Sequence, residues 1–170
     1  MKAIIRLLTS LVVAIIVSIL VFSIGLAATG YVSEQSSDFT GSGLNAANGC
    51  SSSTCQNSNA KYTNQSNNYN NDTASGNWYT GKDNVDQWKT YIPNLSGDWA
   101  GVKYYIGNST PPHEVYETTV NQNNWKGSYV NVGTFSYNST WAQMRLGNRC
   151  IYGYMCDGRR LYFDKSKYIY

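Results

Sequence analysis

The stretch WKGSYVNVGTFSYNSTWAQMRLGNRCIYGYMCDGRRLYFD, residues 125–164, decides the fold of this chain. Apolar residues alternate with polar ones around Gly133, and the phase changes at the glycine: Val130 and Val132 lie before it, Phe135 and Tyr137 after it. A bulge or bend at Gly133 would return both pairs to one face of a sheet. The pattern therefore predicts a bulged β-strand.

Further strands follow within the same stretch. After a turn at Asn138-Ser139 the alternation resumes. Ala142, Met144 and Leu146 share one face of the strand, and Trp141, Gln143 and Arg145 share the other. Leu161 and Phe163 begin another strand after a turn at Asp157-Gly158. Short alternating runs joined by such turns are typical of antiparallel sheets.

The strand pattern extends upstream to residue 76. The large groups that we expect in the core are Trp78, Trp88, Tyr91 and Phe135. Runs with high β-propensity follow at residues 102–106 and 115–121, and no sustained helical period occurs after the N-terminal segment. We predict an all-β fold, an antiparallel jelly-roll-like β-sandwich over residues 76–170, preceded by an N-terminal hydrophobic helix and a flexible stalk.

The first 28 residues form a separate segment. Lys2 and Arg6 precede an uncharged apolar run at residues 7–28, which ends in small residues. A helix of this run would span roughly 30 Å, the thickness of the hydrocarbon core of a bilayer. Residues 1–28 are therefore a signal peptide or, if uncleaved, a membrane anchor through residues 7–28. Either interpretation predicts that the rest of the chain is secreted or lies on the extracellular cell surface.

Residues 29–75 differ in composition from the rest of the chain. They are rich in Ser, Asn, Thr, Gln and Gly, with almost no aliphatic residues after Val32 and Leu44. Such a segment buries too little apolar area to offset the loss of chain entropy on folding. We expect a flexible linker.

The four cysteines of an exported chain predict two disulfides. Local pairing is favoured, with Cys50 bonded to Cys55 and Cys150 bonded to Cys156 around the aromatic loop at residues 151–155. A crossed arrangement that ties the stalk to the sheet stays open. Zinc ligation is disfavoured because the spacings are not of the C-x₂-C type and His113 is the only histidine.

Five Asn-x-Ser/Thr triplets would be glycosylation acceptors on surface loops if the host glycosylates exported proteins. They begin at Asn64, Asn71, Asn94, Asn108 and Asn138. A chain this rich in Asn, Ser and Thr also generates such triplets by chance, so both interpretations stay open.

Charge and motifs exclude several function classes. The net charge is only +3 and the basic residues are dispersed, so no nucleic-acid partner is indicated. No Gly-x-Ser-x-Gly, phosphate loop or His/Cys cluster occurs. The carboxylates that could pair for glycoside hydrolysis or bind calcium have no accompanying signature: Asp83, Asp86, Asp98, Glu114 and Glu117. We expect no catalytic residue, metal or cofactor.

One segment, HEVYETTVNQNNWKGSYVNVGTFSYNSTWAQMRLGN at residues 113–148, resembles the golvesin C-terminal-like domains, also described as xanthan-lyase carbohydrate-binding-like domains. The matching motifs are Val120-Asn121-Gln122, Trp125, residues 132–137 and Met144-Arg145-Leu146. The chain departs from the family at residues 164–169, where Lys and Ser replace Ala and Val, and in its cysteine-bounded loop. The resemblance implies a β-sandwich that accompanies carbohydrate-active enzymes.

Exposed aromatic rings that pack on the apolar face of a pyranose are the expected binding groups. The aromatic residues in or beside turns are Trp99, Trp125, Trp141, Tyr152 and Tyr154. Packing at the sandwich edge explains them equally well. We expect a non-catalytic module that binds a polysaccharide or cell-surface glycan. A structural, assembly-forming surface protein is the alternative, and a small secreted hydrolase ranks third.

Overall fold

The computed structural model describes residues 27–82, 85–95, 101–108, 114–134, 142–151 and 158–170. Within these residues the chain forms antiparallel β-strands and short 3-10 helices, so the predicted all-β class is confirmed. The strands, in chain order, are β1 (Thr29–Val32), β2 (Phe39–Ser42), β3 (Asn45–Ala46), β4 (Lys61–Asn64), β5 (Ser75–Tyr79), β6 (Gln87–Ile92), β7 (Gly101–Asn108), β8 (Glu114–Asn121), β9 (Ser128–Thr134), β10 (Ala142–Gly147), β11 (Arg160–Phe163) and β12 (Ser166–Ile169). The 3-10 helices are η1 (Gln56–Ser58) and η2 (Gln122–Trp125).

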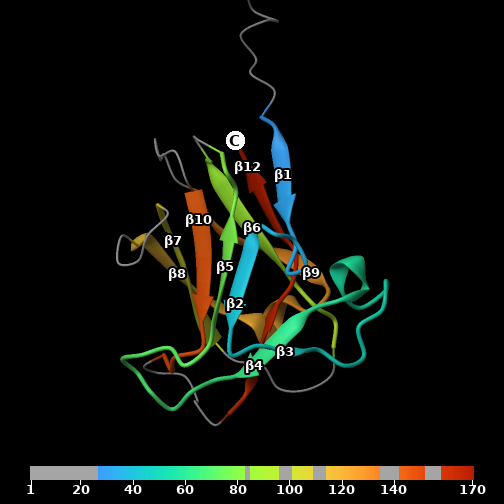
Figure 1. Ribbon diagram of the computed structural model, residues 1–170, viewed down its shortest axis with the longest axis vertical. Helices are drawn as coiled ribbons and strands as arrows, with labels where there is room; N and C mark the ends of the chain where they lie inside the picture. The colour runs from blue at the N-terminus through green and yellow to red at the C-terminus, as the bar shows by residue number, and fades with distance from the viewer. Residues whose placement is uncertain (1–26, 83–84, 96–100, 109–113, 135–141, 152–157) are drawn as a thin grey trace, which may run out of the picture.

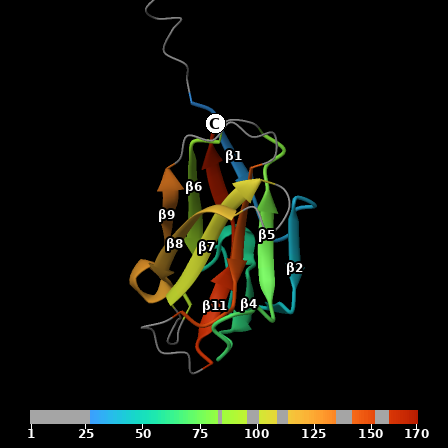
Figure 2. The same ribbon diagram turned by 90° about the vertical axis from the view of Figure 1, so that its left-hand side faces the viewer.

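The strands form two larger sheets and one small sheet (Figure 1). One sheet has the order β1-β12-β6-β9, the second β2-β5-β10-β7-β8, and the small sheet β11-β4-β3. In Figure 2, β6 and β9 lie on one side of the molecule and β5 and β2 on the other. The buried apolar residues of all three sheets belong to one cluster, as in a β-sandwich.

Two fully buried tryptophans, Trp78 and Trp88, lie at the centre of this core, as predicted. The Trp78 ring stacks on Phe163, with 5.9 Å between the ring centroids, and its Nε1–H donates a 3.1 Å hydrogen bond to the Asp164 carbonyl oxygen. The indole polar group is therefore satisfied inside the core. Tyr91 is also buried, whereas Phe135 lies outside the described residues.

The predicted bulge is confirmed. Trp88 on β6 lies opposite Gly133 on β9, but the next residue, Lys89, lies opposite Asn131. Val132 is therefore the extra residue of the bulged strand. The bulge lets Val132 and Gly133 both be buried. The later part of this pattern, residues 135–141, lies outside the described residues.

The alternation on β10 is also confirmed for Ala142, Met144 and Leu146, all of which are buried. Gln143, on the opposite face, is also buried, and Arg145 is half-buried. β10 lies between β5 and β7, so it is a central strand. Both of its faces are therefore covered in part.

The prediction of a flexible linker at residues 29–75 is wrong. Strand β1 pairs with β12, β2 with β5, and β4 with β11, all antiparallel. Each strand contributes few core side chains, such as Val32 and Phe39, and takes its hydrogen bonds from distant parts of the chain. Composition alone does not predict such strands, because most of the apolar surface that they pack against belongs to their partner strands. The β-sheet structure therefore begins near residue 29, not at residue 76.

The predicted N-terminal hydrophobic helix at residues 7–28 lies almost wholly outside the described residues. In the part of the chain that the structure does describe, no helix is long and apolar enough to cross a membrane. Strand β1 and the C-terminal strand β12 lie side by side, and Ala28 and Tyr170 exchange backbone hydrogen bonds of 2.8 and 3.0 Å (Figure 1).

Candidate functional site

The loop between β4 and β5 is fixed to the chain that follows β10. Asn148 is buried, and its Oδ1 accepts 2.9 Å hydrogen bonds from the backbone N–H groups of Thr73 and Ala74. Its Nδ2 donates a 3.0 Å hydrogen bond to the Asn64 carbonyl oxygen. One amide side chain thus replaces the apolar contacts that this polar loop lacks.

Asp72 makes a second attachment in the same loop. Its Oδ2 lies 2.8 Å from an Nη atom of Arg145, and its Oδ1 accepts a 2.7 Å hydrogen bond from the backbone N–H of Arg149. The Asp72 side chain is only 5% exposed. A partly buried, charge-assisted pair of this kind holds its geometry better than a surface ion pair. The backbone at residue 149 is therefore held in one position.

The Arg149 side chain lies on an aromatic ring. Its guanidinium carbon is 4.7 Å from the centroid of the Tyr105 ring on β7. No carboxylate of the described residues lies within ion-pair distance of this guanidinium. The guanidinium is therefore a positioned cation with no carboxylate partner among the described residues.

A pocket of about 520 Å³ opens beside Arg149. It is lined by Tyr69, Lys103, Arg149, Cys150 and Ile151. We call this the Arg149 pocket. Its volume falls within the usual range for small-molecule sites. The β4–β5 loop and the end of β10 lie at the end of the molecule opposite the C-terminus (Figure 1).

The walls of the Arg149 pocket differ in character. Tyr69 is 54% exposed, whereas Cys150 and Ile151 are buried. Lys103 on β7 pairs with Glu117 on β8 at 2.8 Å, and both side chains are partly exposed. The pocket thus combines an exposed aromatic ring, two cations and an apolar floor.

Only one of the five predicted ligand-binding aromatic residues lies within the described residues. Trp125 ends η2 and is 45% exposed, so its ring is accessible as expected. Trp99, Trp141, Tyr152 and Tyr154 lie outside the described residues. Sequence reasoning missed Tyr69, Lys103 and Arg149, because they come from three separate segments and no local pattern joins them.

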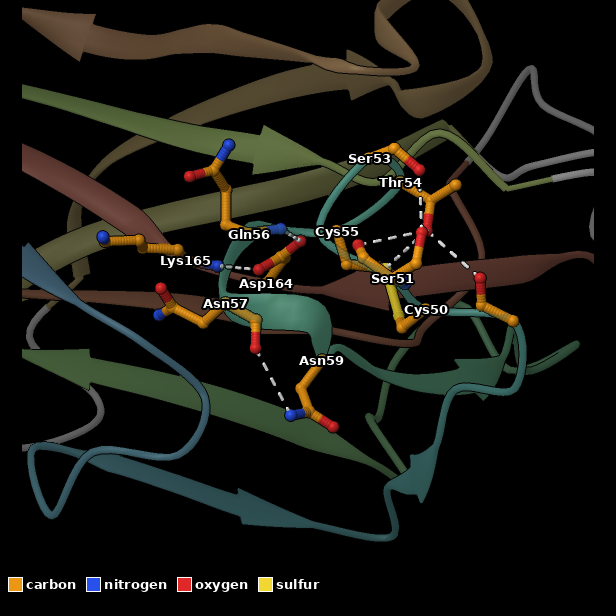
Figure 3. Close-up of a disulfide and its surroundings, with 11 residues drawn as sticks. Cys50, Ser51, Ser53, Thr54, Cys55, Gln56, Asn57, Asn59, Asp164 and Lys165 are labelled. Atoms are coloured by element: carbon orange, nitrogen blue, oxygen red, sulfur yellow. Dashed lines mark hydrogen bonds between the residues drawn. A yellow bond between two sulfur atoms is a disulfide. The ribbon is translucent and has the colours of Figure 1, made fainter.

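The predicted pairing of Cys50 with Cys55 is confirmed. Thr54 closes the loop between them, since its hydroxyl accepts a 2.8 Å hydrogen bond from the Ser51 backbone N–H and donates to the Gly49 carbonyl oxygen (Figure 3). This pairing excludes the crossed arrangement. Cys150 is also disulfide-bonded, and its predicted partner, Cys156, lies outside the described residues.

A pair of buried carboxyl groups lies beside the disulfide loop. Asp164 is fully buried, and its Oδ2 and Oδ1 accept hydrogen bonds of 3.0 and 2.6 Å from the backbone N–H groups of Gln56 and Lys165 (Figure 3). The pKa of Asp164 is raised to about 7, mainly by burial and to a smaller extent by the nearby Glu34. Glu34 is 3% exposed, and neither of its carboxylate oxygens has a hydrogen-bond partner in another described residue. Burial also raises the pKa of Glu34.

The remaining candidates are less informative. Among the described residues, no group of three or more His, Cys, Asp or Glu side chains could hold a metal ion. Asp86 is exposed and Glu117 is paired with Lys103, while Asp83, Asp98 and His113 lie outside the described residues.

Three of the predicted glycosylation acceptors, Asn64, Asn71 and Asn94, are exposed. Asn108 is the last residue of β7, and Asn138 lies outside the described residues. A comparison with known proteins finds no family model and no curated protein that matches this chain.

Proposed function

We propose that this protein is an exported, non-catalytic β-sandwich that binds carbohydrate in the Arg149 pocket. The observation that carries the proposal is the exposed Tyr69 ring beside a pocket of about 520 Å³ with a buried floor. An exposed ring can pack on the C–H face of a sugar, while Lys103 and Arg149 can donate hydrogen bonds to its oxygens. Such a combination of apolar and polar groups is typical of ligand sites.

The way in which the pocket is held supports this role. Tyr69 belongs to a loop that Asn148 and Asp72 attach to the end of β10, and the neighbouring Cys150 is disulfide-bonded. A loop that is ordered before binding loses less conformational entropy when the ligand arrives. The β4–β5 loop and the end of β10 lie at the end of the molecule opposite the C-terminus (Figure 1). A chain attached through its N-terminal segment would present this end to the surroundings.

We further infer that the two larger sheets form a jelly roll with one inserted strand, and that the small sheet is an addition to it. If β5 is set aside, the sheet orders become β1-β12-β6-β9 and β2-β10-β7-β8. This is the pairing that two interleaved Greek keys produce, and it occurs in lectin domains among others. Fold alone does not establish function, so this is an analogy.

The resemblance to golvesin C-terminal-like domains remains part of the proposal. The first two residues of its Val-Asn-Gln motif end β8, and Gln122, which begins η2, is fully buried. Gln122 donates to the Tyr104 hydroxyl and to the Tyr162 carbonyl oxygen. A buried glutamine with this bridging role gives a structural reason for a Gln at the end of this strand.

Export is likewise a proposal. Disulfides persist mainly in oxidising compartments, and the Cys50–Cys55 bond is consistent with an extracellular location. The basic and apolar composition of residues 1–28 supports an export signal or anchor.

A panel of insoluble polysaccharides and a glycan array, probed with the purified protein, test the binding role. We expect retention on at least one glycan and a loss of about tenfold in affinity for Tyr69→Ala, equivalent to about 1.4 kcal/mol. The matched control is Tyr31→Ala, since Tyr31 is similarly exposed, at 51%, but lies on β1. Trp125→Ala tests the second exposed ring in the same assay. Absence of retention on every glycan, or equal losses in Tyr69→Ala and Tyr31→Ala, would contradict the proposal.

Assembly is the second candidate function, favoured by one observation. Strand β8 is eight residues long, lies at the edge of its sheet and pairs with β7 alone among the described strands. Exposed edges of this length are templates for pairing with another chain. Size-exclusion chromatography with light scattering tests this role, and a monomer at all concentrations contradicts it.

A further inference from the structure

We propose that the Arg149 pocket selects acidic saccharides, and that Arg149 binds the carboxylate of a uronic acid. This inference rests on the proposed function, because it names the class of sugar that the same pocket takes. Three observations support it: Arg145 is paired with a carboxylate and Arg149 is not, the Arg149 guanidinium lies on the Tyr105 ring, and Lys103 makes only an exposed ion pair.

The two arginines differ in how their charges are matched. Arg145 already pairs with Asp72 at 2.8 Å. The Arg149 backbone N–H donates to the same carboxylate, but the Arg149 guanidinium pairs with no carboxylate of the described residues. Asp72 therefore neutralises the charge of Arg145. It also holds the backbone of Arg149 in place, but it does not neutralise the Arg149 guanidinium. An unmatched guanidinium lining a pocket favours an anionic ligand.

The contact with Tyr105 sets the orientation of Arg149. A guanidinium that lies 4.7 Å from a ring centroid keeps its N–H edges available, because the ring takes up one face of the cation. Those edges suit the two oxygens of a planar carboxylate, which can accept a pair of parallel hydrogen bonds. A neutral hydroxyl can use only part of this donor set.

Lys103 supplies a second cation on the same pocket. Its partner, Glu117, is 55% exposed, and Lys103 is 29% exposed. Exposed ion pairs of this kind contribute little to stability, so the lysine can turn toward a ligand at little cost. The two cations and one carboxylate leave a net positive charge beside the pocket.

The low net charge of the chain bears on the class of acidic ligand. Polynucleotides fit less well, since the chain lacks the dense basic surface that such partners require.

The experiment compares ligands that differ only in charge. Affinities are measured by calorimetry for oligogalacturonate, oligomannuronate and a glucuronate-containing oligosaccharide, each against its fully methyl-esterified form. We expect at least one acid to bind at least tenfold more tightly than its ester, with a preference that weakens as salt concentration rises. A sulfated neutral oligosaccharide distinguishes a carboxylate site from a general anion site.

The protein variants make the assignment specific. Arg149→Gln should abolish the preference for acid over ester, and Arg149→Lys should restore only part of it. The matched control is Arg160→Gln, because Arg160 also lies on a tyrosine ring, Tyr62, at 4.9 Å but does not line the pocket. Equal losses in Arg149→Gln and Arg160→Gln would overturn the proposal, as would equal binding of every acid and its ester. A neutral glycan bound with Tyr69 dependence but no acid preference refutes this inference alone, whereas no binding to any saccharide refutes the proposed function as well.

Discussion

The carboxylate of Asp72 occupies the space that a side chain at position 147 would need, so Gly147 is the residue that fits there while Asp72 keeps its position. Gly147→Ala should therefore displace Asp72 from Arg145 and from the Arg149 backbone. We expect a loss of about 1 to 3 kcal/mol in the free energy of unfolding, measured by chemical denaturation. Because Arg149 would lose its support, ligand affinity should fall too.

A double-mutant cycle separates this contact from a general effect of alanine at the end of β10. In the Asp72→Ala background, Gly147→Ala should cost much less, because the clashing carboxylate is gone. Equal costs in both backgrounds would show that the Asp72 contact is not what requires glycine at position 147.

Gln122 should be among the most sensitive polar residues of the core. Its amide donates to the Tyr162 carbonyl oxygen at 3.0 Å, and its carbonyl accepts from the Tyr162 N–H at 2.9 Å. Gln122→Leu leaves both backbone groups buried without partners, at about 1 to 3 kcal/mol for each group. Thermal unfolding should show a fall of several degrees. Gln87→Leu is the control, since the Gln87 side chain donates to the exposed Thr134 hydroxyl, and it should change little.

The sequence predicts well those elements whose signal is local. Alternation on β10, the bulge beside Gly133 and the burial of Trp78 and Trp88 all depend on neighbouring residues, and the structure contains all of them. The Cys50–Cys55 bond is local as well, since only four residues separate the two cysteines.

The errors come from long-range pairing. Residues 29–75 look like a linker because they contain few aliphatic groups, yet β1 pairs with the last strand of the chain. The Arg149 pocket has the same origin, since Tyr69, Lys103 and Arg149 are joined only by strand pairing and by the contacts of Asn148 and Asp72. No periodicity in a single segment carries such information.

The N-terminal strand gives a proteolysis test. Gly30 lies so close to the Tyr168 ring that a Cβ atom there would overlap it. Limited proteolysis of the wild-type protein should leave a resistant fragment that begins near Thr29. Gly30→Val should loosen β1 and move the cleavage to the residues before Phe39, as read by mass spectrometry. Thr29→Val, at an exposed neighbouring position, should leave the fragment unchanged, and a wild-type fragment that begins near Ser75 would contradict the pairing of β1.

The buried Asp164 carboxyl predicts how stability depends on pH. Its pKa in the folded protein is about 7, raised from 3.8 mainly by burial, so the folded state holds this proton over a range in which the unfolded chain has lost it. The free energy of unfolding should therefore fall as pH rises from about 4 to about 7, by up to about 1.4 kcal/mol per pH unit from this group, and level off above that range. Denaturation at a series of pH values measures the slope. Asp164→Asn removes this titrating group and should make the slope smaller, leaving the contribution of Glu34, whose pKa burial also raises. The variant loses one hydrogen-bond acceptor and need not be more stable. Glu34→Gln removes the neighbouring negative charge, so the decline should end at a lower pH. A wild-type profile that matches that of Asp164→Asn over this range would show that Asp164 ionises as readily in the folded protein as in the unfolded chain.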